Sequence, residues 1–375
     1  MEKIRDLNPT EMKLLQYVGE CPELTNKELA RRLGLNNHHY ISTLKSNLEE
    51  KQYFVGPYYQ TDYGKIFRNR IRKATAIILF EKPYEFMLSL LKHIGCFSYL
   101  YPIEERFFRS YMVGIFDSDI EGIRRIFDYL KQEGIIFYYE LYLQDSKTQV
   151  ACPTFLHCAE EATFFPLLDN LLEDTAIPDL SFGEFEGITL SKPETILISY
   201  FEKGLSMLTE IMEAEKAKEN FFTYSEWKTA KKPLLSHQII QPVYDVSPLP
   251  SADCSHFFLF LRAESLATTR KTVFNFGKNA RLFRKIFLWT SYHTGETYGV
   301  IYCISHPEFT IKLLTQLDAY EEIEDKKYFD LRKKLSLWKG ESISMEFYDP
   351  SSGTLYYPYD LYLEKIKAFV EENAW

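Results

Sequence analysis

The sequence has no long apolar run and few cysteines. Its longest strongly apolar stretch, near residues 74–80, is far shorter than the roughly 20 residues that cross a bilayer. The charged N-terminus also lacks the apolar segment of a signal peptide. The six cysteines are scattered without a CxxC pair, which predicts neither a disulfide framework nor a zinc site. We therefore expect a cytoplasmic protein with reduced thiols, no membrane contact and no bound metal.

Short motifs of common enzymes are missing as well. The HExxH, GxSxG and P-loop patterns do not occur, and no cysteine and histidine stand at a spacing typical of catalysis. From the residues alone we predict no catalytic residue and no cofactor.

Residues 24–51 have the pattern of two short helices separated by a glycine turn. Thr25 and Glu28 form a capping box, and Gly34 supplies the turn residue. The second helix begins near Asn36, and its apolar residues recur at i, i+3 and i+7. This pattern predicts a helix-turn-helix, although a helical hairpin packed in a core would look similar. The outward residues that could contact bases or phosphates are Asn37, His38, His39, Tyr40, Ser42, Thr43 and Lys45.

Positive charge is concentrated near the N-terminus. The net charge of −9 argues against nucleic-acid binding over the whole surface, but the first 75 residues hold 13 Lys or Arg against 9 Asp or Glu. The densest basic segment is residues 65–73, which we call the basic connector. It can grip phosphates, or it can be a solvated helix or strand edge. Its candidate contacts are Lys65, Arg68, Arg70 and Arg72.

The first half of the chain predicts two domains. A capped helix precedes the helix-turn-helix, and an aromatic stretch at residues 52–64 with Gly56 and Pro57 follows it as a hairpin wing, which together make a winged helix. From residue 74 the order becomes β-α-β-β-α-β, the ferredoxin-like arrangement. A trailing helix is expected at residues 159–172.

The second half repeats the first. Seven residues that begin at Leu190 match seven that begin at Leu7 with one offset of 183. Near Pro358 the offset is 205, which implies an insertion of about 22 residues, and the charged segment 321–334 is the candidate, expected as a solvated helix. We predict an α+β fold of two tandem units, each a winged helix followed by a ferredoxin-like domain. The predicted domains are 1–73, 74–180, 181–252 and 253–375, the last ending in a helix.

The second winged helix is predicted to be degenerate. At the offset of 183, phenylalanines replace the two histidines, a glutamate replaces Thr43, and the connector arginines are lost. Phenylalanine cannot donate hydrogen bonds to bases, and carboxylates repel phosphate, so we expect a structural or interaction module. The replacing residues are Ala217 for Gly34, Phe221, Phe222, Glu226, and then Ser251, Asp253 and Ser255 in the connector.

With both domains in place, the chain resembles the Lrp/AsnC family of transcriptional regulators. The residues that carry the resemblance are KELARRLGL with the helix after it, ATAIILFE, SYMVGIF, DSDIEGI and the GII before the last strand. The resemblance implies a DNA-binding head joined to a ferredoxin-like domain that dimerises and senses an effector. Ordinary members carry one unit per chain, whereas this chain carries two. Its recognition helix also begins NNHHY, and QYF replaces the usual glycine-led entry to the wing.

These observations predict a regulator that binds double-stranded DNA and a small-molecule effector. Because a palindromic site needs two symmetric heads, we expect the chain to form a homodimer. One alternative is a small-molecule binding protein, suggested by strand aromatics such as Tyr99 and Tyr101. Another is an enzyme resembling the siroheme decarboxylases, a family that also brings two Lrp-like units together.

Overall fold

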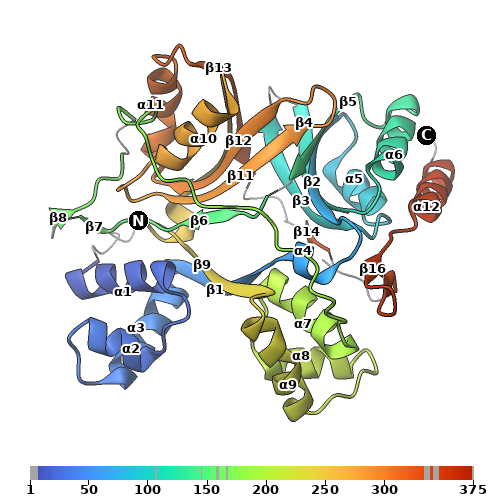
Figure 1. Cartoon of the computed structure of the whole chain (residues 1–375). Helices are drawn as coiled ribbons and strands as arrows, with labels where there is room; N and C mark the ends of the chain where they lie inside the picture. Colours follow the sequence, from blue (N-terminus) through green and yellow to red (C-terminus); the bar gives the residue numbers. More distant parts are fainter. Residues whose placement is uncertain are drawn as a thin grey trace.

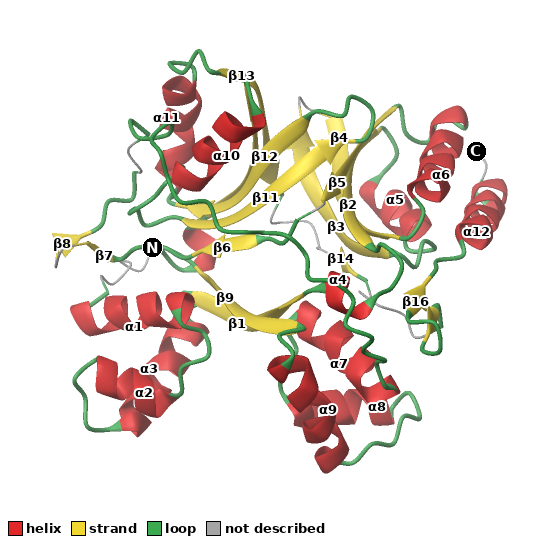
Figure 2. Ribbon diagram, in the orientation of Figure 1, coloured by secondary structure: helices red, strands yellow, loops and turns green. Residues whose placement is uncertain are grey.

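The computed structural model describes residues 7–105, 108–144, 146–157, 160–165, 168–332, 338–340 and 346–373. Two bundles of three helices lie on one side of a two-stranded ribbon, and a larger sheet with helices on its outside lies on the other (Figures 1 and 2). We call the two bundles the first head and the second head. No helix in the described residues is both long and apolar enough to span a bilayer.

The first head contains α1 (Pro9–Glu20), α2 (Asn26–Arg32) and α3 (His38–Glu50). Asn8 and Thr25 cap the first two helices, each in a capping box with a glutamate three residues later. Helix α3 buries Ile41, Leu44 and Leu48 against the other two. The predicted helix-turn-helix is confirmed.

The second head contains α7 (Lys192–Lys203), α8 (Leu208–Lys216) and α9 (Tyr224–Ser236). Ser191 and Glu194 form the predicted capping box of α7. However, α9 begins at Tyr224 with Thr223 as its cap, whereas α3 begins at His38 with Asn37 as its cap. The offset in this helix is therefore 186, and the equivalence that placed Phe221 and Phe222 opposite the two histidines was wrong.

A ribbon of two antiparallel strands joins the heads. β1 (Phe54–Thr61) pairs with β9 (Ile240–Val246), from Phe54 opposite Val246 to Thr61 opposite Ile240. The predicted hairpin wing is wrong, because β1 continues through Gly56 and Pro57 with only a shift of register there. A strand from the other half of the chain supplies the backbone partners that a hairpin would have supplied. In the ribbon each strand packs on the opposite head, β1 on α7 and β9 on α1.

Each half then forms the predicted ferredoxin-like domain. The first domain has the strand order β5-β2-β4-β3, and the second has the equivalent order β13-β10-β12-β11. The elements of the first domain are β2 (Arg72–Phe80), α5 (Tyr84–Leu91), β3 (Phe97–Glu105), β4 (Phe108–Asp117), α6 (Ile120–Gln132) and β5 (Tyr138–Gln144). Those of the second are β10 (Ser255–Ala263), α10 (Leu266–Asn275), β11 (Phe283–Ser291), β12 (Thr297–Ser305), α11 (Pro307–Leu317) and β13 (Ile323–Leu331).

The two sheets join at both edges and close into one ring of eight strands. β13 pairs with β3, and β11 pairs with β5, both antiparallel. The inside of the ring is packed with large side chains from both domains, which include Ile77, Met112, Tyr142, Phe258, Phe260 and Trp289. Lys327 of β13 donates to Glu140 and to the hydroxyl of Tyr142, both on β5, so an ion pair also links the halves.

The segment 321–334 is not a solvated helix, and that prediction was wrong. Residues 323–331 form β13, the fourth strand of the second ferredoxin-like sheet, hydrogen bonded to β10 and β3. Its charged residues find partners on other strands, such as Glu140 for Lys327 and Tyr298 for Asp325. Lys333 and Lys334 lie outside the described residues.

The expected helix at 159–172 is also wrong in the described residues, where β8 (Glu160–Glu161) and turns take its place. Leu168 and Leu171 are buried in the core of the second domain. The Asn275 amide donates to the carbonyls of Leu171 and Glu173, and thus holds this backbone in a non-helical form. Residues 159, 166 and 167 lie outside the described residues.

Short elements and a final helix complete the chain. The C-terminal helix α12 (Tyr359–Glu372), as predicted, packs on α5 and α6 of the first domain. Each half therefore sends a tail onto the opposite domain. The short elements are α4 (Tyr63–Ile66), β6 (Gln149–Ala151), β7 (Leu156–His157), the 3-10 turn η1 (Ser251–Asp253), β14 (Trp338–Lys339), β15 (Tyr348–Asp349) and β16 (Thr354–Leu355).

These contacts between the two halves predict that the halves stay together without the covalent link between them. A protease site inserted after Gly187, which has open space around it and lies in an exposed loop, should be cut without loss of structure. We expect the two fragments to co-elute in size-exclusion chromatography at the mass of the intact chain, because the ribbon and both sheet seams remain. The same digest in denaturant should separate them, and separation in native buffer would contradict the interlocked fold.

Candidate nucleic-acid interface and an adjoining cavity

The outward face of α3 presents small polar and aromatic side chains. His38, His39, Ser42 and Thr43 are exposed, and Tyr40 is 47% exposed. The imidazole rings of the two histidines lie 4.2 Å apart. These exposed groups can offer hydrogen-bond donors and acceptors to base edges. Exposed Ser46 and Asn47 extend the same face by one turn and were missed.

Two of these residues also serve the helix itself. Asn37 is the N-cap of α3, and its Oδ1 accepts a hydrogen bond from the backbone N–H of His39 at 2.9 Å. The Thr43 hydroxyl donates to the carbonyl of His39 at 3.3 Å. Both side chains are exposed, so a ligand can still reach their remaining lone pairs.

Lys45 does not belong to this face. Its Nζ lies 5.4 Å from the centre of the Tyr244 ring on β9, and burial lowers the pKa of its amine. Lys231 makes the equivalent contact in the second head, 5.4 Å from the ring of Tyr59 on β1. The two lysines thus fasten the heads to the ribbon, and we leave Lys45 out of the proposed DNA contacts.

The basic connector lies beside the second head and away from α3 (Figure 1). Lys65 donates to the carbonyl of His237 at 2.9 Å, just after α9. Arg72 pairs with Asp117 at 3.0 Å, where burial raises the pKa of the Asp117 carboxyl and Arg72 opposes that rise. These two cations therefore stabilise contacts within the chain, and they do not join α3 in one interface.

Arg68 and Arg70 are exposed and stay as candidate phosphate contacts. The guanidinium of Arg68 lies 5.5 Å from the centre of the Phe185 ring, and its backbone N–H donates to Gly353. Arg68 is thus placed near the linker between the halves and the C-terminal region.

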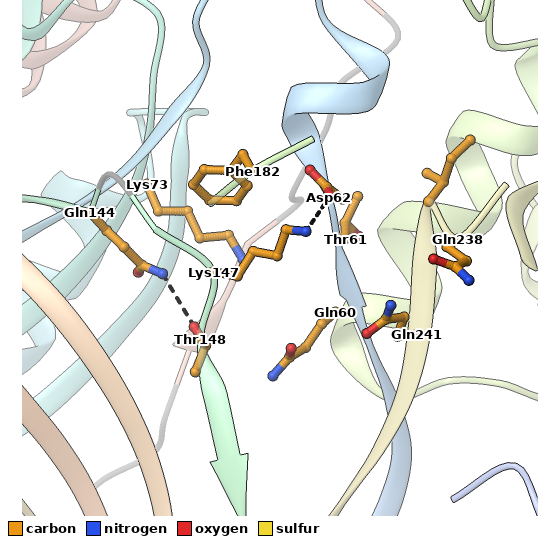
Figure 3. A pocket seen from close by; sticks show the side chains of 11 residues that line it. Gln60, Thr61, Asp62, Lys73, Gln144, Lys147, Thr148, Phe182, Gln238 and Gln241 are labelled. Atoms are coloured by element: carbon orange, nitrogen blue, oxygen red, sulfur yellow. Dashed lines mark hydrogen bonds and ion pairs between the residues drawn. The ribbon is translucent and has the colours of Figure 1, made fainter. Parts of the chain in front are cut away.

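A small polar cavity of about 40 Å³ lies between the ribbon and the first ferredoxin-like sheet (Figure 3). One wall is the ribbon with the residues beside it, a second is the sheet end with the loop after β5, and Phe182 of the linker stands at its side. The lining residues are Gln60, Thr61, Asp62, Lys73, Gln144, Lys147, Thr148, Phe182, Gln238, Ile239 and Gln241.

The lining of this cavity favours negative charge. Asp62, the single carboxylate among these residues, already pairs with Lys147 at 2.8 Å and accepts from the N–H of Gly183 at 3.0 Å. Among the described residues, the amine of Lys73 is in no ion pair and lies 5.0 Å from the centre of the Tyr63 ring and 5.6 Å from that of Phe116. The glutamines belong to no recognisable motif, and the lining residues come from separate segments of the chain. The sequence alone therefore does not reveal this cavity. Within the described ranges, no three His, Cys, Asp or Glu side chains are grouped to hold a metal.

Residues 7–37 match the winged helix-turn-helix DNA-binding family. No curated protein matches the chain. Among solved structures, a siroheme decarboxylase, NirDL, in co-complex with an iron-uroporphyrin III analogue, covers 97% of this chain and 99% of its own, at 11% identity and a TM-score of 0.47. As the sequence predicted, Lrp/AsnC regulators are among the chains that resemble this one.

Two of these regulators each correspond to a little over a third of the chain. AsnC of E. coli covers 37% of this chain and 92% of its own, at 10% identity and a TM-score of 0.30. LrpA, the leucine response regulatory protein of Mycobacterium tuberculosis, covers 36% and 91%, at 15% identity and a TM-score of 0.28.

The position of Lys45 gives a test. Lys45→Met keeps the hydrocarbon stem on Tyr244 and removes the charge, so we expect no change in the salt dependence of DNA binding. A lysine that contacts phosphate would instead reduce the slope of log K against log salt by about 0.9. Fluorescence anisotropy at several salt concentrations measures this slope, and Lys92→Met, at an exposed lysine just after α5, is the control. A slope reduced as for a phosphate contact would return Lys45 to the interface.

Proposed function

We propose that the chain is a transcriptional regulator that binds double-stranded DNA through α3. The exposed polar face of α3 carries this proposal, because it belongs to a helix-turn-helix whose residues 7–37 match a DNA-binding family. In such a motif the second helix enters the major groove, and the residues near its N-terminus contact base edges. His38, His39, Ser42 and Thr43 occupy those positions.

The first head has little net charge. Residues 7–61 hold six Lys or Arg and six Asp or Glu, and residues 1–6 hold two of each sign, so the excess of positive charge in the first 75 residues belongs to the basic connector. General attraction to phosphate is therefore weak. Affinity must come from base contacts and from further phosphate contacts elsewhere on the chain, which favours a sequence-specific binder over a non-specific one.

We further propose that a small anion binds in the cavity between the ribbon and the first ferredoxin-like sheet. A ligand there would touch Gln60 and Gln241 on the ribbon and Lys73 and Gln144 on the sheet. The ribbon packs on both heads, so such a ligand can bias the position of the heads. The size of about 40 Å³ suits a few water molecules or a small carboxylate or phosphate group.

The alternative of a siroheme-decarboxylase-like enzyme is less well supported by the cavities. Siroheme is a large ring that carries many carboxylates, and the cavity of about 40 Å³ is too small for it. A wider opening of about 430 Å³ lies beside the second domain, but three of its lining residues, Glu160, Glu161 and Asp169, are carboxylates. Like charges disfavour this ligand there. A haem-like absorption band after siroheme is added would favour the enzyme.

The α3 face can be tested by removing its two hydroxyl groups. We expect Ser42→Ala with Thr43→Ala to weaken binding to a DNA sequence selected from a random pool about tenfold, since each lost hydrogen bond costs about 0.5–1.5 kcal/mol. Binding to unselected DNA should change little. Ser89→Ala, an exposed serine on α5, is the control. Equal losses on selected and unselected DNA would contradict base reading by these residues.

The cavity can be tested by thermal unfolding with phosphate or acetate. An anion that binds only the folded chain stabilises it by about 1.4 kcal/mol for each tenfold concentration above Kd, so the unfolding temperature should rise steadily. Lys73→Met should abolish the rise, whereas Lys92→Met should leave it intact. An equal rise in both variants would mean that the anions act elsewhere.

A further inference from the structure

Helix α9 occupies in the second head the place that α3 occupies in the first. Trp227, Ala230 and Leu234 are buried where α3 buries Ile41, Leu44 and Leu48, each 186 residues later. A glutamine with positive φ follows each helix, Gln52 at 59° and Gln238 at 52°, again 186 apart. The ribbon strand then begins two residues later in both heads. Three features thus give the same register.

The corrected register changes which residues face outward. The exposed stripe of α9 consists of Ser225, Lys228, Thr229, Lys232 and Ser236. The equivalent stripe of α3 consists of His39, Ser42, Thr43, Ser46 and Glu50. Thr229 thus matches Thr43, and two outward lysines take the places of two serines. The face that the offset of 183 described as phenylalanine and glutamate is in fact polar and basic.

The residues that suggested degeneracy have other roles. Phe221 and Phe222 precede the helix, and Phe222 packs edge-on against Trp227. The Glu226 carboxylate accepts from the N–H and the hydroxyl of Thr223, both at 2.7 Å, in the capping box of α9. The second head, like the first, has almost no net charge, since residues 191–246 hold seven Lys and eight Asp or Glu.

The ribbon places both helices on one side of the molecule. α1 to α3 and α7 to α9 lie below the ribbon, opposite the ferredoxin-like domains (Figure 1). The ribbon strands run antiparallel, and the lysine contacts to Tyr244 and Tyr59 recur across them, which indicates an approximate two-fold axis between the heads. Two reading helices related in this way can face two half-sites on one duplex.

We propose that α9 is a second DNA-reading helix, so that one chain binds a site of two unlike halves. This proposal rests on the proposed function of α3. The charge of this helix indicates that its ligand is DNA. Within the described residues, Lys228 and Lys232 are in no ion pair, and both are exposed on one stripe of the helix. Lysine binds phosphate or the O6 and N7 atoms of guanine. The half-site of α9 should therefore differ from that of α3, and a second copy of the chain is not needed.

The test uses the full chain on a duplex selected from a random pool. Hydroxyl-radical footprinting of the wild type should show two protected patches about one helical turn apart. Lys228→Ala with Lys232→Ala should remove one patch and weaken binding by tenfold or more, and Ser42→Ala with Thr43→Ala should weaken the other. Lys92→Ala with Lys131→Ala, which removes two exposed lysines just after α5 and on α6, is the charge-matched control and should keep both patches.

These outcomes distinguish a failure of this inference from a failure of the proposed function on which it rests. Two patches with one chain per duplex, measured by light scattering, support it. One patch in the wild type, unchanged in the Lys228 and Lys232 variant, overturns it and leaves α3 as the reading helix. Two chains per duplex, with both patches lost in the Ser42 and Thr43 variant, also overturn it. If the wild type binds no DNA at low salt, the proposed function fails too. Equal unfolding temperatures of all variants exclude a folding defect.

Discussion

The arrangement depends on reciprocal edge pairing between the two ferredoxin-like sheets. Each sheet alone would leave the edges of its second and fourth strands unpaired and one aromatic face uncovered. β13 pairs with β3 and β11 with β5, so both edges of both sheets are closed within one chain. The ring encloses Tyr142, Phe260 and Trp289, which neither sheet could bury by itself. A second chain therefore has no open edge to complete in these seams, and the two-fold arrangement arises within the molecule.

The same reciprocity extends to the heads and tails. β1 packs on α7 and β9 packs on α1, Leu168 and Leu171 fill the second core, and α12 covers the first domain. The heads are thus positioned by strands that belong partly to the opposite half. A change in the ribbon can therefore reach both heads, and each head also has contacts outside the ribbon, such as Glu202 of α7 with Tyr63 and Met12 of α1 with Arg281. The cavity beside Gln60 and Gln241 lies where a bound ligand would touch this shared attachment.

Sequence patterns predicted the structure correctly where neighbouring residues determine it. The capping boxes at Asn8, Thr25 and Ser191 mark real helix starts, and the apolar stretch at residues 74–80 lies in a real strand. They failed where a distant segment decides the structure. The charged residues of β13 resemble a solvated helix until β10 and β3 supply its backbone partners and Glu140 pairs with Lys327. The hairpin at Gly56 failed for the same reason, because β9 replaces its second strand. The cavity is built from separate segments, so no single stretch could reveal it.

The register of α9 shows how a correct repeat can still mislead. The offset of 183 fits the first helix and the first sheet strand of each half. Between them, the turn before α9 is longer than the turn before α3, and the segment after β9 is shorter than the segment after β1. The offset therefore rises to 186 and then returns to 183. Thr223 and Glu226 carry the missed signal, a capping box.

The presence of two similar heads bears on the affinity for DNA. Both heads are close to neutral, so each alone should bind DNA weakly. Because both heads belong to one chain and share the ribbon, binding of the first head raises the effective concentration of the second at its own half-site. Two weak and unlike contacts can then give tight and directional binding, in which the chain takes one orientation on the duplex.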